Sequence, residues 1–250
     1  MTAAGAFKRL ARPDLACIDV RMLRLLFCLL VLAVPARADF VLSNLRMTLY
    51  HELGHAVIDQ MNVPMFGPEE NAADSFALVL ANRLHSEAEM AVLIRDMTTL
   101  GRIEAGQELF DPWDEYMPGA QRMSRAICLY HGMNPTARAP LARALGMPSF
   151  MADECAEQSA VIQRAWGRIL DAAAPPPGSQ SQSLRPAVKG KALRLLAKDI
   201  DRVNAHVRLP RPIPVEWEDC GEDNAYYYHW DERIVFCSEM VDALRENALR

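Results

Sequence analysis

The stretch that decides the fold is Tyr50-His51-Glu52-Leu53-Gly54-His55-Ala56-Val57, which places two imidazoles and a carboxylate close together in the chain. On an α-helix, side chains four residues apart share one face, so His51 and His55 can direct ring nitrogens at a single ion. Glu52 projects beside them, where it can take a proton from a metal-bound water. This His-Glu-x-x-His spacing is typical of zinc hydrolases, with Glu52 as the general base.

The surrounding residues predict the helix that such a site needs. Apolar side chains recur at steps of three and four residues, namely Val41, Leu42, Leu45, Leu49, Leu53, Val57 and Ile58. That period predicts an amphipathic helix with one apolar face to bury. Two histidines supply only half of a tetrahedral zinc shell. A catalytic zinc needs a third protein ligand while one position stays open for water.

The next apolar-periodic segment supplies a candidate for the third ligand. Pro68 and the two glutamates after it mark a helix start, and residues 62–68 predict a short reversing loop before it. Glu70 and Asp74 stand four residues apart, so they share one helix face. Glu70 is predicted to ligate the ion, and Asp74 to accept the far N–H of a ligating histidine. Glu69 is predicted to be a solvated residue of the helix start.

Residues 1–38 have the three parts of a secretory signal peptide. A basic leader is followed by the apolar run Leu25–Val34, and small residues at Ala36 and Ala38 suit cleavage before Asp39. The apolar run is too short to span a bilayer, so we expect no stable membrane insertion after cleavage. The chain is predicted to be exported to the periplasm or secreted, with Met1 or Met22 as its start.

The charge of residues 39–250 argues against a nucleic-acid partner. Removing residues 1–38 takes away six of the 27 Lys and Arg and two of the 32 Asp and Glu, which leaves a net charge of −9. Nucleic-acid binding surfaces are basic, so this balance excludes that class of function. The remaining residues are enough for one domain with a buried core.

Four cysteines remain after position 38, namely Cys128, Cys155, Cys220 and Cys237. An even number in an exported chain predicts two disulfides. Three pairings are possible, and the one that joins neighbouring segments is Cys128 with Cys155 and Cys220 with Cys237. A four-cysteine metal site is the rival interpretation, and the absence of any Cys-x-x-Cys pair argues against it.

The rest of the chain predicts a mainly helical α+β fold with a small β-hairpin at its C-terminal end. Further helices are predicted over 87–101, over 153–170 and at about 192–207. Residues 172–191 are rich in Pro, Ser and Gln and predict a flexible connector. Aromatic and β-branched residues at 224–228 and 233–237 predict two short strands, clasped by Cys220 and Cys237.

With these segments in place, the chain resembles the DUF4344 family, a bacterial group of exported, zincin-like metallopeptidases. The resemblance covers about residues 40–250. Its motifs are His51-Glu52-Leu53-Gly54-His55 with the tyrosine before it, Glu69-Glu70-Asn71-Ala72-Ala73-Asp74, Gln121-Arg122 ahead of Cys128, and Cys220-Gly221-Glu222 with Asn224-Ala225-Tyr226. The resemblance implies a zinc peptidase of the gluzincin type that acts on peptides or proteins.

A second resemblance concerns substrate binding. Asn224, Ala225 and Tyr226, followed by Ile234-Val235-Phe236, are similar to the Asn-Ala-Tyr edge strand of neprilysin-type peptidases, which binds the substrate backbone. In those enzymes the strand precedes the zinc helix, whereas here it follows. We expect it to bind an extended peptide by β-augmentation. The candidate donors to the oxyanion are Tyr116, His206, His229 and the tyrosines at 226–228.

The sequence therefore predicts a zinc-dependent peptidase in which His51, His55 and Glu70 hold Zn²⁺ and Glu52 activates water. Two alternatives from other classes stay open. The chain could be a zinc-containing binding module that no longer cleaves, which an exchange of Glu52 would separate from an enzyme. It could also be a metal-free structural domain held by disulfides, in which case metal analysis would find nothing.

Overall fold

The computed structural model describes residues 20–109, 111–187 and 190–249, with side chains from Phe40 onward. The chain divides into two compact units, Met1–Ala36 and Arg37–Arg250. The described elements are, in order, α1 (Val20–Gln60), α2 (Glu69–Leu84), α3 (Glu87–Ala105), α4 (Gly119–Met133), α5 (Pro135–Ala144), the 3₁₀ turn η1 (Ser149–Met151), α6 (Ala152–Ala172), β1 (Leu184–Pro186), α7 (Lys191–His206), β2 (Ile213–Glu218), β3 (Ala225–Tyr228), β4 (Arg233–Cys237) and α8 (Met240–Asn247). The fold is therefore α+β and mainly helical, as the sequence predicts.

The C-terminal part of α1 lies in the core of the second unit, because its side chains from Leu45 to Val57 are apolar at helical spacing. Leu45, Leu49 and Leu53 are fully buried. Gly54 lets α2 approach closely, since a Cβ atom there would stand 3.0 Å from Ala73 Cα and 3.1 Å from Phe76 Cδ1. The glycine in the motif thus allows the backbones of α1 and α2 to pack closely where the polar residues meet.

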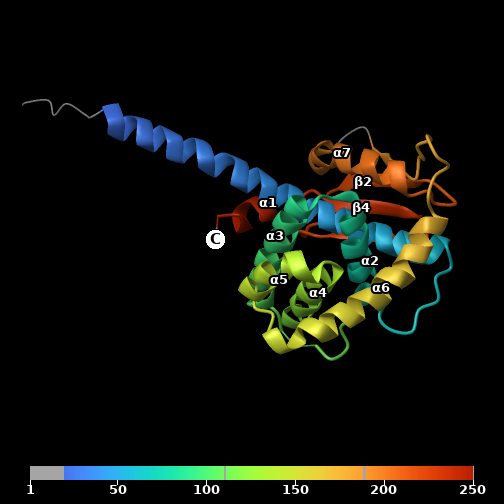
Figure 1. Cartoon of the computed structure of the whole chain (residues 1–250). Helices are drawn as coiled ribbons and strands as arrows, with labels where there is room; N and C mark the ends of the chain where they lie inside the picture. The colour runs from blue at the N-terminus through green and yellow to red at the C-terminus, as the bar shows by residue number, and fades with distance from the viewer. Residues whose placement is uncertain (1–19, 110, 188–189, 250) are drawn as a thin grey trace, which may run out of the picture. The chain divides into compact units, whose positions relative to one another are not determined.

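Six further α-helices follow this pair in the described part of the chain, and three of them match segments with apolar periodicity in the sequence. The predicted helices at 87–101, 153–170 and about 192–207 are confirmed as α3, α6 and α7. In α3, Ser86 and Glu89 form a capping box that satisfies the first backbone N–H groups. Figure 1 shows α4, α5 and α6 gathered in the lower part of the second unit and α7 beside the sheet.

The contact between α4 and α6 is close because Gly132 has no side chain. A Cβ atom on Gly132 would come within 2.2 Å of both the Cys155 carbonyl oxygen and Ser159 Oγ. We expect Gly132→Ala to lower the free energy of unfolding by about 1–3 kcal/mol, because the two helices must separate. Denaturant unfolding checks this. Gly67→Ala is the control, since its Cβ would meet nothing within 4 Å, and an equal loss in both variants would contradict the explanation.

The predicted hairpin is present as β3 and β4, and it belongs to a larger sheet of order β1-β2-β4-β3. The strands β1, β2 and β4 are parallel, while β3 is an antiparallel edge strand. Prolines before and within β2 favour a loop in the sequence, yet β2 is an interior strand. Pro214 precedes the first β2–β4 pair, Val215 with Ile234, so its missing N–H removes no bond to β4.

The segment 172–191, which the sequence predicts as a flexible connector, makes specific contacts in its central part. The Ser181 and Ser183 hydroxyls both donate to the Val207 carbonyl, at 2.6 and 3.0 Å. Leu184 is the first residue of β1, and its side chain is only 1% exposed. Polar side chains that read as a solvated run therefore bind backbone groups at the end of α7, which composition alone does not reveal.

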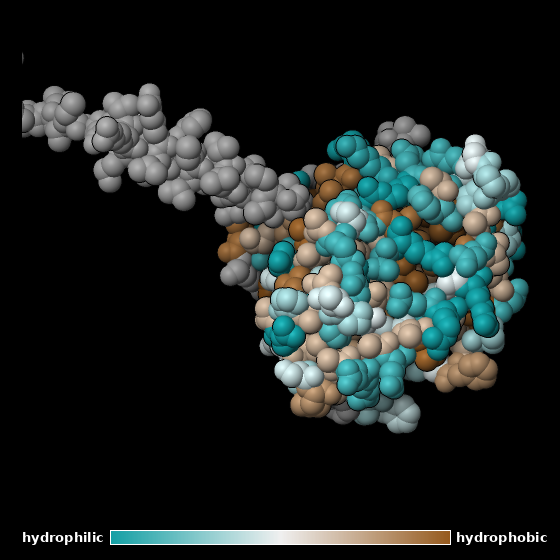
Figure 2. Space-filling view, in the orientation of Figure 1, coloured by the Kyte–Doolittle hydropathy of each residue, from teal (hydrophilic) through white to brown (hydrophobic). Residues whose placement is uncertain are grey.

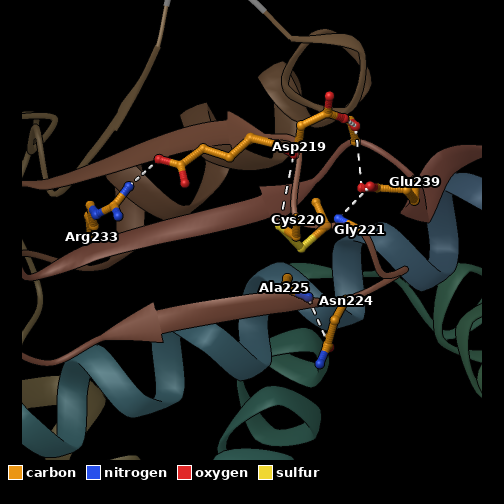
Figure 3. The surroundings of a disulfide bond; sticks show 10 residues. Asp219, Cys220, Gly221, Asn224, Ala225, Arg233 and Glu239 are labelled. Carbon is orange, nitrogen blue, oxygen red and sulfur yellow. Dashed lines mark hydrogen bonds and ion pairs between the residues drawn. A yellow bond between two sulfur atoms is a disulfide. The ribbon is translucent and has the colours of Figure 1, made fainter.

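The structure has two disulfides, Cys128–Cys155 between α4 and α6, and Cys220–Cys237 between the loop before β3 and the end of β4. Figure 3 shows the second of these. Close to it, the Gly221 N–H donates to Glu239 Oε1 at 2.7 Å and the Ala225 N–H donates to Asn224 Oδ1 at 2.9 Å. The loop that leads into β3 is thus tied at both ends. Two disulfides indicate an oxidising compartment.

The predicted signal peptide falls largely outside the described structure. Residues 1–19 are not described, and of residues 20–38 only the helical backbone is. Within the part of the chain that is described, no helix combines the length and apolar character needed to cross a membrane.

Candidate metal site

The two histidines of α1 face one carboxylate of α2. Their Nε2 atoms lie 3.2 Å apart. Glu70 stands against both, with Oε2 at 3.0 Å from His51 Nε2 and Oε1 at 3.4 Å from His55 Nε2. All three residues are buried or half-buried. The structure therefore brings together the three residues that the sequence predicts as ligands.

The opposite ring nitrogens are held by two other carboxylates of α2. His51 Nδ1 lies 2.9 Å from Asp74 Oδ1, and His55 Nδ1 lies 2.7 Å from Glu69 Oε1. A carboxylate accepts the Nδ1 proton and leaves the Nε2 lone pair available to a ligand. Asp74 thus lies where the spacing predicts, whereas the prediction that Glu69 is a solvated residue fails, because its carboxylate contacts His55.

These groups suit a metal ion. When both imidazoles are neutral and donate through Nδ1, two lone pairs and a carboxylate converge on one point, where either protons or a metal ion can join them. Atoms around a tetrahedral zinc at about 2.0–2.1 Å stand about 3.3 Å apart. The distance of 3.2 Å between the two Nε2 atoms matches this spacing, and a different oxygen of Glu70 lies close to each of them, at 3.0 Å from His51 and 3.4 Å from His55.

The electrostatics of the site favour positive charge at the same point. Burial by itself lowers the pKa of His51, but hydrogen bonds to Asp74 and Glu70 outweigh it and raise that pKa to about 9. Burial raises the pKa of Glu70, but its bonds to His51 and His55 hold that pKa far below the usual range. The site therefore holds a negative carboxylate beside histidines that readily accept a cation.

Glu52 lies beside the ligands and is 6% exposed. Burial raises the pKa of its carboxyl to about 7, against the opposing effects of His51 and His55. The Tyr227 backbone on β3 hydrogen-bonds this carboxylate. A carboxyl with a pKa near neutrality is suited to accept a proton and to release it again.

A further residue of α4 supports the site. Arg122 makes two hydrogen bonds to Asp74, from Nε to Oδ2 at 2.6 Å and from a terminal nitrogen to Oδ1 at 2.8 Å. Its guanidinium also lies 4.7 Å from the centre of the Tyr116 ring. The Tyr116 hydroxyl hydrogen-bonds Glu70, and burial together with that carboxylate raises the tyrosine pKa. Arg122 thus orients groups that touch two of the three candidate ligands.

We expect Arg122→Ala to lower the affinity for zinc by roughly 10–100-fold, because Asp74 loses the partner that fixes its carboxylate against His51. Competition with a chromogenic chelator measures this. Arg125→Ala is the matched control, since Arg125 lies on the same helix and is exposed. Equal affinities of the Arg122 and Arg125 variants would contradict the role.

The candidate oxyanion donors fall into two groups. Tyr116 lines the cavity at the metal site together with His51 and Glu52. His229, in the β3–β4 turn, lies with its ring centre 6.3 Å from that of His55 and with Nε2 3.8 Å from Glu69 Oε1. His206, in contrast, is exposed and bonds the Arg202 carbonyl of its own helix. The structure brings Tyr116 and His229 to the site and leaves His206 away from it.

A buried polar network connects α1 to α7 through Tyr50, the residue before His51. The hydroxyl of Tyr50, which is 0% exposed, lies 2.9 Å from His85 Nε2 and 3.4 Å from Asp199 Oδ1. Arg46 donates to both oxygens of Asp199, at 2.6 and 3.2 Å. Arg202 donates to His85 Nδ1 at 2.8 Å. The residue before His51 is thus anchored to α7, which restrains rotation of the helix that carries both histidines.

The edge strand β3 runs beside the candidate metal site. The Cys237 N–H donates to the Asn224 carbonyl at 2.9 Å. Because ladder bonds alternate along antiparallel strands, the backbone groups of Ala225 and Tyr227 point away from β4. The contact between the Tyr227 backbone and Glu52 agrees with this. The Tyr227 hydroxyl donates to Asp59 of α1 at 2.7 Å, so side chain and backbone both attach the strand to α1.

Comparison with known proteins adds one match. The model of the family DUF4344, whose description is "putative metallopeptidase", matches residues 33–170 and 176–249. Neither a curated protein nor a solved structure matches the chain.

Proposed function

The chain belongs to the DUF4344 family, and from that premise we propose that it is an exported, zinc-dependent peptidase of the gluzincin type. The observation that carries the proposal is the convergence of His51 Nε2, His55 Nε2 and the Glu70 carboxylate on one point. These three residues would hold the ion. Asp74 and Glu69 would fix the two imidazole rings through their Nδ1 atoms.

A bound zinc ion supplies a Lewis acid that polarises the scissile carbonyl and lowers the pKa of water. Glu52 takes a proton from the attacking water and passes it to the leaving nitrogen. The raised pKa of Glu52 favours the first transfer, because it makes the carboxylate a better proton acceptor. Tyr116 lines the same cavity and is the candidate tyrosine donor for the oxygen that becomes negative.

The position of β3 at the end of the described sheet supports an extended peptide as substrate. A peptide that adds to Ala225 and Tyr227 would form main-chain hydrogen bonds beside Glu52, so the scissile bond would lie next to the general base. Asn224, Ala225 and Tyr226 are the substrate-binding residues of this proposal. Asn224 also lines the cavity that contains His51 and Glu52.

We expect Asn224→Ala to lower kcat/KM for peptides by roughly 3–10-fold, which corresponds to the loss of one neutral hydrogen bond. The Asn224 side chain accepts from the Ala225 N–H, so its loss frees the first residue of the edge strand. Steady-state kinetics with a fluorogenic peptide checks the effect. Unchanged kcat/KM and unchanged affinity for a peptide inhibitor would remove Asn224 from the site.

The direct test of the function uses a mixture of peptides that covers all residue types. We expect the zinc-loaded protein to cleave members of this mixture, to lose the activity after chelation and to regain it when zinc is returned. Mass spectrometry of the products records each step. A zinc-loaded protein that cleaves no peptide would overturn the peptidase and favour a binding module.

A further inference from the structure

A cavity of about 520 Å³ begins at the candidate metal site and extends away from it between helices. Its lining includes His51 and Glu52 at one end, and reaches Leu100 on α3 and Ile162 on α6. Asn224, at the start of the edge strand, is also part of the wall. The cavity is therefore continuous with the place where the reacting carbonyl of a substrate would lie.

Methionines from separate elements dominate the apolar part of this wall. They are Met47 on α1, Met97 on α3, Met117 just before α4, Met123 on α4 and Met240 on α8. Methionine is unbranched and polarisable, so a wall of this kind adapts to large apolar groups of different shapes. The molecular face in Figure 2 is mainly hydrophilic, with hydrophobic residues in separate patches.

Outside the candidate metal site, the charged residues that line the cavity are either paired or exposed, and we call the exposed Glu104 and Asp223 the mouth carboxylates. Arg122 is engaged by Asp74 through two hydrogen bonds. Glu104, Arg125 and Asp223 also line the cavity, but all three residues are exposed. A charged side chain that entered the methionine-lined part would lose water without gaining a partner there, which is costly.

We infer that this cavity is the substrate's principal side-chain pocket and that it takes a large apolar side chain, such as Leu, Met or Phe. The residue concerned lies next to the scissile bond, because Glu52 and His51 form part of the same wall. The inference rests on the proposed function, since it assigns a specificity to that site. Full burial of such a side chain contributes roughly 10–100-fold in affinity.

Binding to the Glu52→Gln protein tests the pocket without cleavage. The probes are acetyl-Ala-Ala-Xaa-Ala-Ala-amide peptides in which Xaa is Leu, Met, Phe, Gly, Asp or Lys, and titration calorimetry on the zinc-loaded protein gives each Kd. We expect the Leu, Met and Phe peptides to bind roughly 10–100-fold more tightly than the Gly and Asp peptides. Tightest binding of the Lys peptide would instead assign the mouth carboxylates as the recognition element and overturn the inference.

Two substitutions at Met97 locate the selectivity. Met97→Trp should weaken binding of the Phe peptide by at least about tenfold by filling the pocket, while Met97→Ala should shift the preference from Leu toward Phe. Met133→Trp and Met133→Ala are the matched controls. Met133 is also half-buried and packed on the same core, but it does not line the cavity. Equal changes at both positions would overturn the assignment.

The two proposals fail in different ways. If the wild-type protein cleaves none of the peptides while the Glu52→Gln protein binds the apolar ones selectively, the proposed peptidase activity is wrong and the proposed apolar pocket is supported. If wild-type protein cleaves peptides without regard to Xaa and the Met97 variants behave as the Met133 controls do, the peptidase stands and the pocket is wrong.

Discussion

Glu52→Gln is expected to lower peptide turnover by roughly 10²–10⁴-fold, the usual loss when a general base is removed. Glutamine has nearly the same shape and cannot accept the proton of the attacking water. Glu52 is not among the residues whose atoms converge on the candidate ion, so zinc content should stay at the wild-type level. Turnover of a fluorogenic peptide and elemental analysis of the same sample measure the two effects.

The control for this variant is Glu154→Gln, because Glu154 lies exposed in the first turn of α6. It should leave both turnover and zinc content unchanged. If the Glu52→Gln protein turned over peptide at the wild-type rate, another group would have to activate the water. A simultaneous loss of zinc would show that Glu52 supports the ion instead.

His51→Ala is expected to reduce zinc affinity by more than the roughly 10–100-fold that the loss of a supporting group costs. The substitution removes a ligand and leaves Asp74 and Glu70 without their shared partner. Like charges at these two carboxylates then face each other across the empty position. Equilibrium dialysis against buffered zinc measures the affinity.

His206→Ala is the matched control, since His206 is exposed and bonds only the carbonyl of its own helix among the contacts described. Its zinc affinity should equal that of the wild type. If His51→Ala bound zinc as tightly as His206→Ala, the ion would have to sit elsewhere in the molecule.

The residues within each helix of the site could be predicted, because helical spacing is a local property. His51 with His55, and Glu70 with Asp74, are each four residues apart and so share a face in any α-helix. Partners supplied by other segments could not be predicted in this way. Arg122 reaches Asp74 across 48 residues of sequence, and the Tyr227 backbone reaches Glu52 from the far end of the chain.

Glu69 shows how a correct local rule can give a wrong role. An acidic residue in the first turn of a helix is favourable in solvent, because it faces the positive end of the helix dipole. The same position places Glu69 Oε1 at 2.7 Å from His55 Nδ1 once α2 packs on α1. The close packing of α2 on α1 at Gly54 brings Glu69 to His55, and this packing cannot be read from the local sequence.

The sheet likewise contains strands that could be predicted from the sequence and strands that could not. The strands β3 and β4 could be predicted, because both are rich in aromatic or β-branched residues and are joined by a short turn. The strands β1 and β2 could not, since Ser, Gln and Pro favour loops and turns in any local pattern. Pairing of Leu184 with Ile213, and of Val215 with Ile234, joins segments that only the tertiary fold brings together.

The metal content of the purified wild-type protein tests the central claim most directly. Native mass spectrometry should show about one zinc ion per chain, and elemental analysis should identify zinc as the metal. The claim rests on two imidazole nitrogens and a carboxylate that converge on one point and could hold a metal ion there. Wild-type protein that folds with both disulfides formed and binds no divalent metal, even when zinc is supplied, would contradict it.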